Sequence, residues 1–223
     1  MTRIILVRHG QTDWNRVEHY RGRVDVPLNE TGFAQAEATG WRIKQEWQSD
    51  AAAIYSSPLA RTMQTAVVIG GHINLPVHSF YGLIDLNMGQ WEGLTPVQVR
   101  EKWPEMHAAW YSTPQAVSFP GGETLARVRT RTMSGLYELI ERHDGRNIIL
   151  VSHTDVIRVI LLSVLGLGNE RLWSIRQDNC AINVIEWEES SAEAAVVTMN
   201  DTAHLREWAG LMSLVDVAQC DRE

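Results

Sequence analysis

The sequence predicts an α/β protein, a three-layer αβα sandwich with a mostly parallel central sheet, from three observations. Residues 4–7 and 148–151 are short runs of branched and aliphatic side chains, typical of strands buried on both faces. Segments with helical apolar spacing follow such runs, and this alternation is the pattern of a parallel sheet. The chain has 223 residues, of which 44% are hydrophobic, which suffices for a single domain with a substantial core. We therefore predict one domain over residues 1–223, with an aromatic-rich helical insert, a lid or cap, at about residues 82–122.

Charge and cysteine content restrict the possible partners. The formal net charge is −7, which argues against nucleic acid or an anionic membrane, because those surfaces select basic patches. The apolar run near the start is too short for a secretory signal, and no segment has the roughly 18 apolar residues of a membrane span. Cys180 and Cys220 stand in no metal-ligand or redox spacing, so we expect free thiols and no disulfide. These observations predict a cytoplasmic protein.

The first strand, residues 4–7, ends at Arg8, His9 and a glycine. Ligands of open α/β sheets bind outside the carboxyl ends of the strands, so this strand delivers two anion-seeking side chains to that edge. An isolated Arg-His-Gly tripeptide is more often an ordinary strand end. Whether it forms part of a site must therefore be decided from other segments of the chain. Residues 12–29 are polar and predict a long loop over this edge, with Arg21 among its basic residues.

The next four segments complete the first half of the sheet. Residues 33–47 have helical apolar spacing behind Thr31, which we expect to cap this helix. Residues 52–56 predict a second strand. Residues 59–69 predict the following helix, and Pro58 suits its first turn. Arg61 then lies in the first turn, beside the free N–H groups and the positive dipole end of the helix, at the same edge as His9.

Residues 75–122 interrupt the alternation with prolines and tryptophans. Only residues 95–103 and 106–111 have a helical pattern, and most of the tryptophans are expected in the core, because large aromatic side chains dominate buried area. This segment is the predicted insert.

The second half of the chain again contains a buried strand that ends at a histidine and is followed by a helix. Residues 123–142 predict a long helix closed by Gly145. Residues 147–151 predict a strand that ends at His153, and residues 155–165 predict an apolar crossover helix. Residues 181–187 and 195–199 predict two strands, antiparallel to each other and near a sheet edge. The tail contains a short amphipathic pattern around residues 205–215.

Four side chains from distant parts of the sequence are thus expected at one edge of the sheet: Arg8, His9, Arg61 and His153. Two guanidinium groups and two imidazoles that converge on one crevice suit a tetrahedral dianion, because arginine donates paired hydrogen bonds to phosphate oxygens. The sequence therefore predicts a phosphate site.

Several blocks of the sequence resemble the histidine phosphatase superfamily, the phosphoglycerate-mutase-like clan, in the right order along most of the chain. They are Leu6-Val7-Arg8-His9-Gly10-Gln11-Thr12-Asp13-Trp14-Asn15, Pro27-Leu28-Asn29-Glu30-Thr31-Gly32, Tyr55-Ser56-Ser57-Pro58-Leu59-Ala60-Arg61-Thr62, Gly89-Gln90-Trp91-Glu92-Gly93 and Val151-Ser152-His153. The resemblance implies a phosphoglycerate-mutase-like fold and a histidine acid-type phosphatase. It implies that His9 is the nucleophile and is phosphorylated, that Arg8, Arg61 and His153 hold the phosphoryl group, and that Asn15 lines the pocket. Such chemistry requires no metal and no cofactor.

The resemblance leaves two positions open. Relatives usually carry a glutamate as the acid that protonates the leaving group, and this chain has Asp85 there. Glu92 is the alternative acid, although we expect it to pack beside Trp91. Arg21 stands where phosphatase relatives often have glutamine, and it either adds a guanidinium to the phosphate site or faces solvent.

The motifs Pro120-Gly121-Gly122-Glu123-Thr124, Ser152-His153-Thr154, Gln177-Asp178-Asn179-Cys180-Ala181 and Thr202-Ala203-His204-Leu205 are similar to bacterial metal-independent phosphoserine phosphatases. The similarity implies substrate contacts from Glu123, Thr124, Thr154 and His204, and a small phosphorylated metabolite as substrate. Sugar phosphates and ribazole phosphate are alternative substrates, and a cofactor-dependent phosphoglycerate mutase is the alternative activity. A catalytically silent phosphoester-binding module is the alternative of another class. The sequence leaves a homodimer open.

Overall fold

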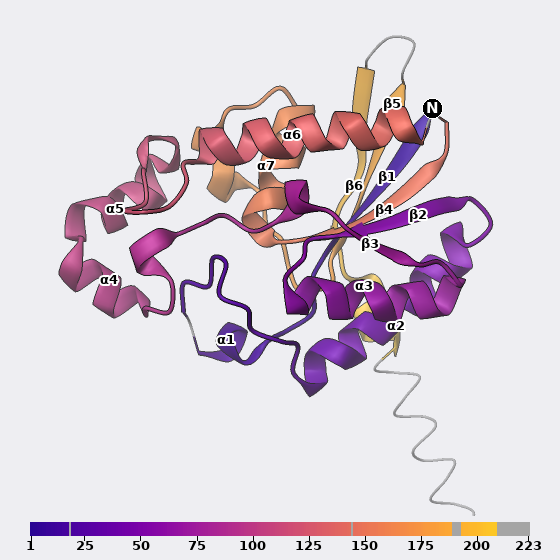
Figure 1. The fold of residues 1–223 in the computed structure, drawn as a ribbon, viewed down its shortest axis with the longest axis horizontal. Helices are drawn as coiled ribbons and strands as arrows, with labels where there is room; N and C mark the ends of the chain where they lie inside the picture. The colour runs from indigo at the N-terminus through magenta and orange to yellow at the C-terminus, as the bar shows by residue number, and fades with distance from the viewer. Residues whose placement is uncertain (18, 144, 189–192, 209–223) are drawn as a thin grey trace, which may run out of the picture.

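The computed structural model describes residues 1–223 apart from residues 18, 144, 189–192 and 209–223. A six-stranded sheet in the order β3-β2-β4-β1-β5-β6 forms its centre (Figure 1). The strands are β1 (Thr2–Arg8), β2 (Ala51–Ser56), β3 (Val77–Ser79), β4 (Asn147–Ser152), β5 (Ile182–Glu188) and β6 (Glu193–Asp201). The first four are parallel, whereas β5 is antiparallel to both β1 and β6. The predicted mostly parallel sheet with an antiparallel pair at one edge is confirmed.

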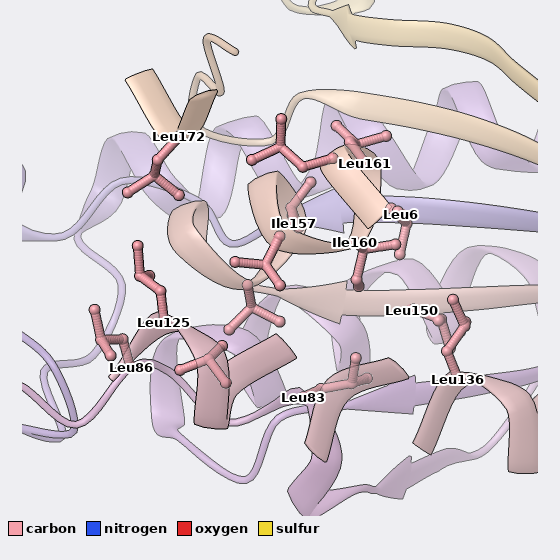
Figure 2. Close-up of a cluster of buried hydrophobic side chains, with 14 of the residues drawn as sticks. Leu6, Leu83, Leu86, Leu125, Leu136, Leu150, Ile157, Ile160, Leu161 and Leu172 are labelled. Atoms are coloured by element: carbon pink, nitrogen blue, oxygen red, sulfur yellow. The ribbon is translucent and has the colours of Figure 1, made fainter. Parts of the chain in front are cut away.

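Helices cover both faces of this sheet. Alternate residues of β1 point to opposite faces, so Ile4 and Leu6 lie in one core while Ile5 and Val7 lie in the other. α6 (Leu125–Arg142) and α7 (Thr154–Val164) cover the first face, and α2 (Glu30–Trp47) and α3 (Ala60–Ile73) cover the second (Figure 1). Figure 2 shows the first core, in which leucine and isoleucine side chains of α7 and α6 meet those of β1 and β4. Burial of each such side chain stabilises the fold by about 1.5–3 kcal/mol. The three-layer prediction is confirmed.

Several helix boundaries differ from the predicted ones, among them those of α2, α3 and α6. Asn29, not Thr31, caps α2, because its side-chain oxygen accepts the N–H of Gly32 at 2.9 Å. α3 begins at Ala60, so Pro58 precedes the helix, and the free N–H of Ala60 donates to Asp25 Oδ1 instead. α3 also continues to Ile73, beyond the predicted end. α6 begins two residues later than predicted, since Thr124 is its N-cap.

Aromatic side chains pack the segment between β3 and α6. It contains α4 (Pro96–Lys102), α5 (Pro104–Ser112) and the short 3-10 helices η1 (Tyr81–Leu83), η2 (Gly89–Trp91) and η3 (Pro114–Ala116). Trp91 and Trp110 are buried, and both make edge-to-face contacts with Phe119, with ring centroids 5.0 and 5.2 Å apart. The expected core role of these two tryptophans is confirmed. The bounds of the insert, residues 82–122, stay a prediction.

Four smaller features complete the fold. The predicted loop after β1 contains the short helix α1 (Asp13–Arg16), and the 3-10 helix η4 (Asn169–Ser174) follows α7. Residues 203–208 are helical, and the rest of the predicted tail helix, with Cys220, lies outside the described residues. Cys180 is a buried free thiol. Within the described chain, no helix combines the length and apolarity that a bilayer crossing needs.

Candidate active site

The carboxyl ends of β1, β2 and β4 bring the four predicted side chains together. Arg8 is the last residue of β1, Arg61 lies in the first turn of α3 after β2, and His153 is the N-cap of α7 after β4. The rings of His9 and His153 lie with their centroids 5.4 Å apart. The Nε–H of Arg61 donates to Nδ1 of His153 at 3.3 Å. The structure therefore places these four residues in one cluster.

His9 has one ring nitrogen engaged and one free. Its Nδ1 lies 2.7 Å from the carbonyl oxygen of Gly10, which can only accept, so Nδ1 carries the proton. Burial, followed by the charges of Arg61 and Arg8, holds the pKa of His9 well below its usual range. The neutral ring then has its lone pair on Nε2. This tautomer is the one that a nitrogen nucleophile requires.

Two residues just before β5 (Ile182–Glu188), Asn179 and Cys180, hold the backbone of His9 in place. Its carbonyl oxygen accepts hydrogen bonds from Asn179 Nδ2 at 3.0 Å and from the N–H of Cys180 at 3.3 Å. The N–H of Cys180, whose φ of 54° lies in the left-handed region, also donates to the carbonyl of Arg8 at 3.1 Å. We infer that the segment before β5 fixes the position of the histidine.

Arg61 is fully buried and connects three parts of the site. Its Nη1 donates to the carbonyl of Val24 at 2.9 Å, and its Nη2 donates to the carbonyl of Gly22 at 2.8 Å. Nη2 also lies 2.9 Å from Oδ2 of Asp85. The guanidinium thus ties the loop after β1 to Asp85 and His153, and it places a fixed positive charge beneath the site.

His153 is neutral for the same reasons as His9. Burial and the Arg61 charge hold its pKa well below the usual range. Because Nδ1 accepts from Arg61, the proton lies on Nε2, which donates to Ser57 Oγ at 2.8 Å. Asp85 Oδ2 is 3.4 Å from the same Nδ1.

An open cavity of about 300 Å³ lies above this cluster. It is lined by Arg8, His9, His19, Tyr20, Arg21, Gly22, Asp85, Met88, Trp110, Tyr111, Thr154, Asp155, Arg158, Trp173 and Gln177. Arg8 donates from Nη1 to the Gln177 carbonyl at 2.7 Å, while its buried Nε has no partner among the described residues. Burial and the charges of Arg21 and Arg158 lower the pKa of Arg8 to about 9, so it stays charged at neutral pH. A concave site with an excess of guanidinium groups suits a phosphate dianion.

Asp85 is the carboxyl group of the cavity whose pKa is raised. Burial, assisted by the negative charge of Asp155, raises its pKa to about 6, against the opposing effects of Arg61, Arg21 and the Leu86 N–H. Neutral His153 also faces it. A carboxyl with a pKa near 6 is partly protonated close to neutral pH, which suits a general acid.

Asp85→Asn should therefore slow esters with poor leaving groups by at least about 100-fold and an aryl phosphate by only a few-fold. A phenolate departs with little help from an acid. In the unsubstituted protein, activity on the alkyl ester should fall as the pH rises through about 6, because Asp85 loses its proton there. The Asn variant should lack this alkaline limb. Steady-state rates on an alkyl and an aryl phosphate across pH provide the measurement.

Glu92→Gln is the matched control, because Glu92 is the alternative acid. Its Oε1 accepts the backbone N–H groups of Arg23 and Met88, and it does not line the cavity. If the leaving-group selectivity arose in Glu92→Gln instead of Asp85→Asn, the role assigned to Asp85 would be wrong.

The remaining predicted residues divide into two groups. Arg21 and Thr154 line the cavity, and Asn15 lines an adjoining one that shares Arg21 with it. Asn15 Oδ1 accepts the N–H of Thr12 at 2.9 Å, so it also shapes the loop after β1. Arg21 faces the cavity, and within the described part of the chain its guanidinium makes one hydrogen bond, a long contact of 3.5 Å to Thr12 Oγ1.

Glu123, Thr124 and His204, in contrast, do not line either cavity. Glu123 forms ion pairs with Arg23 and Arg131 at 3.0 Å each, and both arginines also donate to the carbonyl of Asp85. Thr124 caps α6.

His204 lies against α2, where its Nε2 is 3.1 Å from Thr39 Oγ1. Helix capping, ion pairing and core packing engage the side chains of Thr124, Glu123 and His204, and their direct contact with substrate stays a prediction.

Several residues of the cavity were not predicted. Asp155 and Arg158 lie on the first turns of α7, and Tyr111 and Trp173 stack with ring centroids 5.1 Å apart at the rim. The only signal in the sequence was a charged pair three residues apart at the start of an otherwise apolar helix.

A neutral histidine, several arginines and a carboxylic acid around one cavity place the protein among phosphoric monoester hydrolases of α/β fold. The chain belongs to the histidine phosphatase superfamily (branch 1), whose sequence pattern matches residues 4–202.

Similar proteins include phosphoserine phosphatase 1 of Hydrogenobacter thermophilus, 36% identical over 208 residues, which are 93% of this chain and 96% of that protein. The metal-independent phosphoserine phosphatase of Arabidopsis thaliana is 30% identical over 207 residues, covering 92% of this chain and 84% of that protein. The crystal structure of a phosphoserine phosphatase mutant from Entamoeba histolytica in complex with phosphoserine superposes with a TM-score of 0.81 at 27% identity, covering 92% of this chain and 100% of that one.

Proposed function

We propose that the protein hydrolyses phosphate monoesters of small metabolites without a metal, through a phosphohistidine at His9. The observation that carries the proposal is the tautomer of His9, with its proton directed at the Gly10 carbonyl and its Nε2 lone pair free in a cavity rich in guanidinium groups. The names of the relatives support phosphoserine-like substrates.

The proposed reaction has two displacements. In the first, Nε2 of His9 attacks phosphorus, the P–O ester bond breaks, and Asp85 gives its proton to the departing oxygen. Arg8 and Arg21 hold the equatorial oxygens, and the charge of Arg61 lies beneath them. In the second, ionised Asp85 takes a proton from water as the oxygen attacks phosphorus, which breaks the N–P bond and releases phosphate. Each group then returns to its starting state.

The competing activity is a cofactor-dependent phosphoglycerate mutase, which must keep the phosphohistidine from water and bind both ends of phosphoglycerate. Residues 95–123 contain only Arg100 and Lys102 as arginine or lysine, and neither lines the cavity. The insert contributes Trp110 and Tyr111 to the wall instead of cations. This composition supports water as the acceptor.

The test is a side-by-side assay of phosphate release from several monoesters and of the conversion of 3-phosphoglycerate to 2-phosphoglycerate with a bisphosphoglycerate primer. We expect phosphate release to be faster for at least one ester. Interconversion much faster than release from every ester would favour the mutase.

Hydrolysis should survive exhaustive chelation, because the three arginines of the cavity, Arg8, Arg21 and Arg158, outnumber its two carboxylates, Asp85 and Asp155, and can neutralise the phosphoryl group without a metal. Among the described residues, no three or more His, Cys, Asp or Glu side chains form a group that could hold a metal ion. Activity is measured before and after dialysis against a chelator, with a magnesium-dependent phosphatase treated in parallel. A loss that a divalent cation restores would contradict the prediction.

Phosphoserine-like esters remain our first choice of substrate and sugar phosphates the alternative. A homodimer and a cytoplasmic location stay predictions from the sequence, and light scattering on the purified protein tests the former.

A further inference from the structure

Asp155 is a buried carboxylate for which the proposed reaction has no use. It lies at the start of α7, is 8% exposed, and lines the same cavity as Arg8, His9 and Asp85. Its Oδ1 accepts from Nη1 of Arg158 at 3.2 Å. Its Oδ2 makes no hydrogen bond with any residue that the structure describes. One carboxylate oxygen therefore remains available to a molecule in the cavity.

A second negative charge in a phosphate site opposes the binding of a dianion, because like charges at this range repel strongly where water is scarce. Arg158 pairs with Oδ1 alone, and its Nε is engaged by the Ile175 carbonyl at 2.7 Å. The charges of Arg8 and Arg21 also act on Asp155, but neither side chain donates to its Oδ2 within the described part of the chain. A cationic group on the substrate would supply the direct partner that Oδ2 lacks.

The wall near Asp155 has the character of a cation site. Trp110, Tyr111 and Trp173 line the cavity with Asp155, and the Arg158 guanidinium already lies over the Trp173 ring at 4.8 Å, as cations do on aromatic faces. The cavity of about 300 Å³ has room for a phosphoryl group and a leaving group of a few heavy atoms.

We propose that Asp155 binds an ammonium group on the leaving alcohol, so that the preferred substrates are phosphate monoesters of amino alcohols. The inference rests on the proposed phosphatase function and names its substrate class. The phosphoryl group lies at His9 and Arg8, the ester oxygen faces Asp85, and the ammonium group lies at the Oδ2 of Asp155.

Two matched pairs of substrates test this on the unsubstituted protein. Phosphoserine and 3-phosphoglycerate differ only by an ammonium group in place of a hydroxyl, and so do phosphoethanolamine and 2-hydroxyethyl phosphate. We expect kcat/KM to favour the ammonium member of each pair by about 10- to 100-fold, the usual effect of a hydrogen bond to a charged group. Equal kcat/KM values within both pairs would overturn the proposal.

The variant Asp155→Asn keeps the shape and removes the charge. We expect the preference within each pair to fall by at least about 10-fold, and Asp155→Glu to restore part of it. Glu138→Gln is the matched control, because it removes the carboxylate of another ion pair on a helix, with Arg142, away from the cavity. The Glu138→Gln variant should prefer the ammonium member of each substrate pair as strongly as the unsubstituted protein does.

Other results separate the alternatives. If Asp155→Asn slowed both members of each pair equally, the residue would be structural and the inference wrong. The ratio of kcat/KM values within each substrate pair, measured on the unsubstituted protein, decides the substrate class even if the Asp155→Asn variant fails to fold. If the unsubstituted protein released no phosphate from any ester, p-nitrophenyl phosphate included, the proposed function itself would fail.

Discussion

His9→Ala should lower kcat/KM by at least about 10⁴-fold and abolish phosphoryl transfer to the protein, because the nucleophile takes part in both displacements. Nε2 of His9 has no hydrogen bond to any residue that the structure describes, whereas Nδ1 is bonded to Gly10 and the carbonyl to Asn179 and Cys180. The measurement is a rapid alkaline quench during turnover, followed by mass spectrometry of the peptide that contains residue 9. Phosphohistidine survives alkali and is lost in acid.

His78→Ala provides the control, because His78 is exposed on β3 and does not line the cavity. This variant should keep both turnover and the phosphoryl adduct. An acid-labile phosphoryl adduct on the His9→Ala protein would show that another residue is the nucleophile. A silent phosphoester-binding module, the alternative of another class, would give no adduct in the unsubstituted protein.

Arg61→Lys should lower kcat/KM by at least about 100-fold, because a point charge cannot replace a planar fork with donors in several directions. Lysine can satisfy at most part of the acceptors that Arg61 now serves, which are the carbonyls of Gly22 and Val24, Asp85 and His153. A buried carbonyl left without a donor costs about 1–3 kcal/mol, so the free energy of unfolding should fall by a similar amount. Urea denaturation and steady-state kinetics measure the two effects.

Arg142→Lys is the matched control, since Arg142 is exposed and pairs with Glu138 on the surface of α6. It should change neither activity nor stability by a measurable amount. If Arg61→Lys kept full activity and lost only stability, Arg61 would be a structural residue without a part in the chemistry.

The sheet and the four clustered residues could be predicted from the sequence because both depend on local patterns. A strand buried on both faces is apolar throughout, and the side chains that follow its last residue reach one edge of a parallel sheet whatever the details of packing. Arg8 and His153 follow this rule directly. The antiparallel edge pair was also predictable, since exposed residues of β6 alternate with half-buried ones, as in a strand at the edge of a sheet.

The surroundings of other residues depend on contacts between distant segments, which the sequence does not show. Glu123 pairs with Arg23, which lies a hundred positions away, and with Arg131. Asp155 was predicted only as the first residue of an apolar helix, and the folded chain shows that this helix start opens into the cavity. The predicted N-cap of α2, Thr31, was wrong for a smaller reason. Asn29 and Thr31 are both residue types that cap helices well, and they lie only two positions apart.

The central place of β1 has a consequence for synthesis of the protein. The strand that carries the nucleophile is made first, yet its hydrogen-bonding partners are β4 and β5, which are made late. At about 5–20 residues per second, roughly 7 to 30 s pass on the ribosome between Arg8 and Ser152, its partner in β4. During that time an apolar strand has no sheet to join, and such long-range pairing makes folding slow. We expect nascent chains of this protein to depend on chaperones that shield the strand, and fragments released before β5 to aggregate.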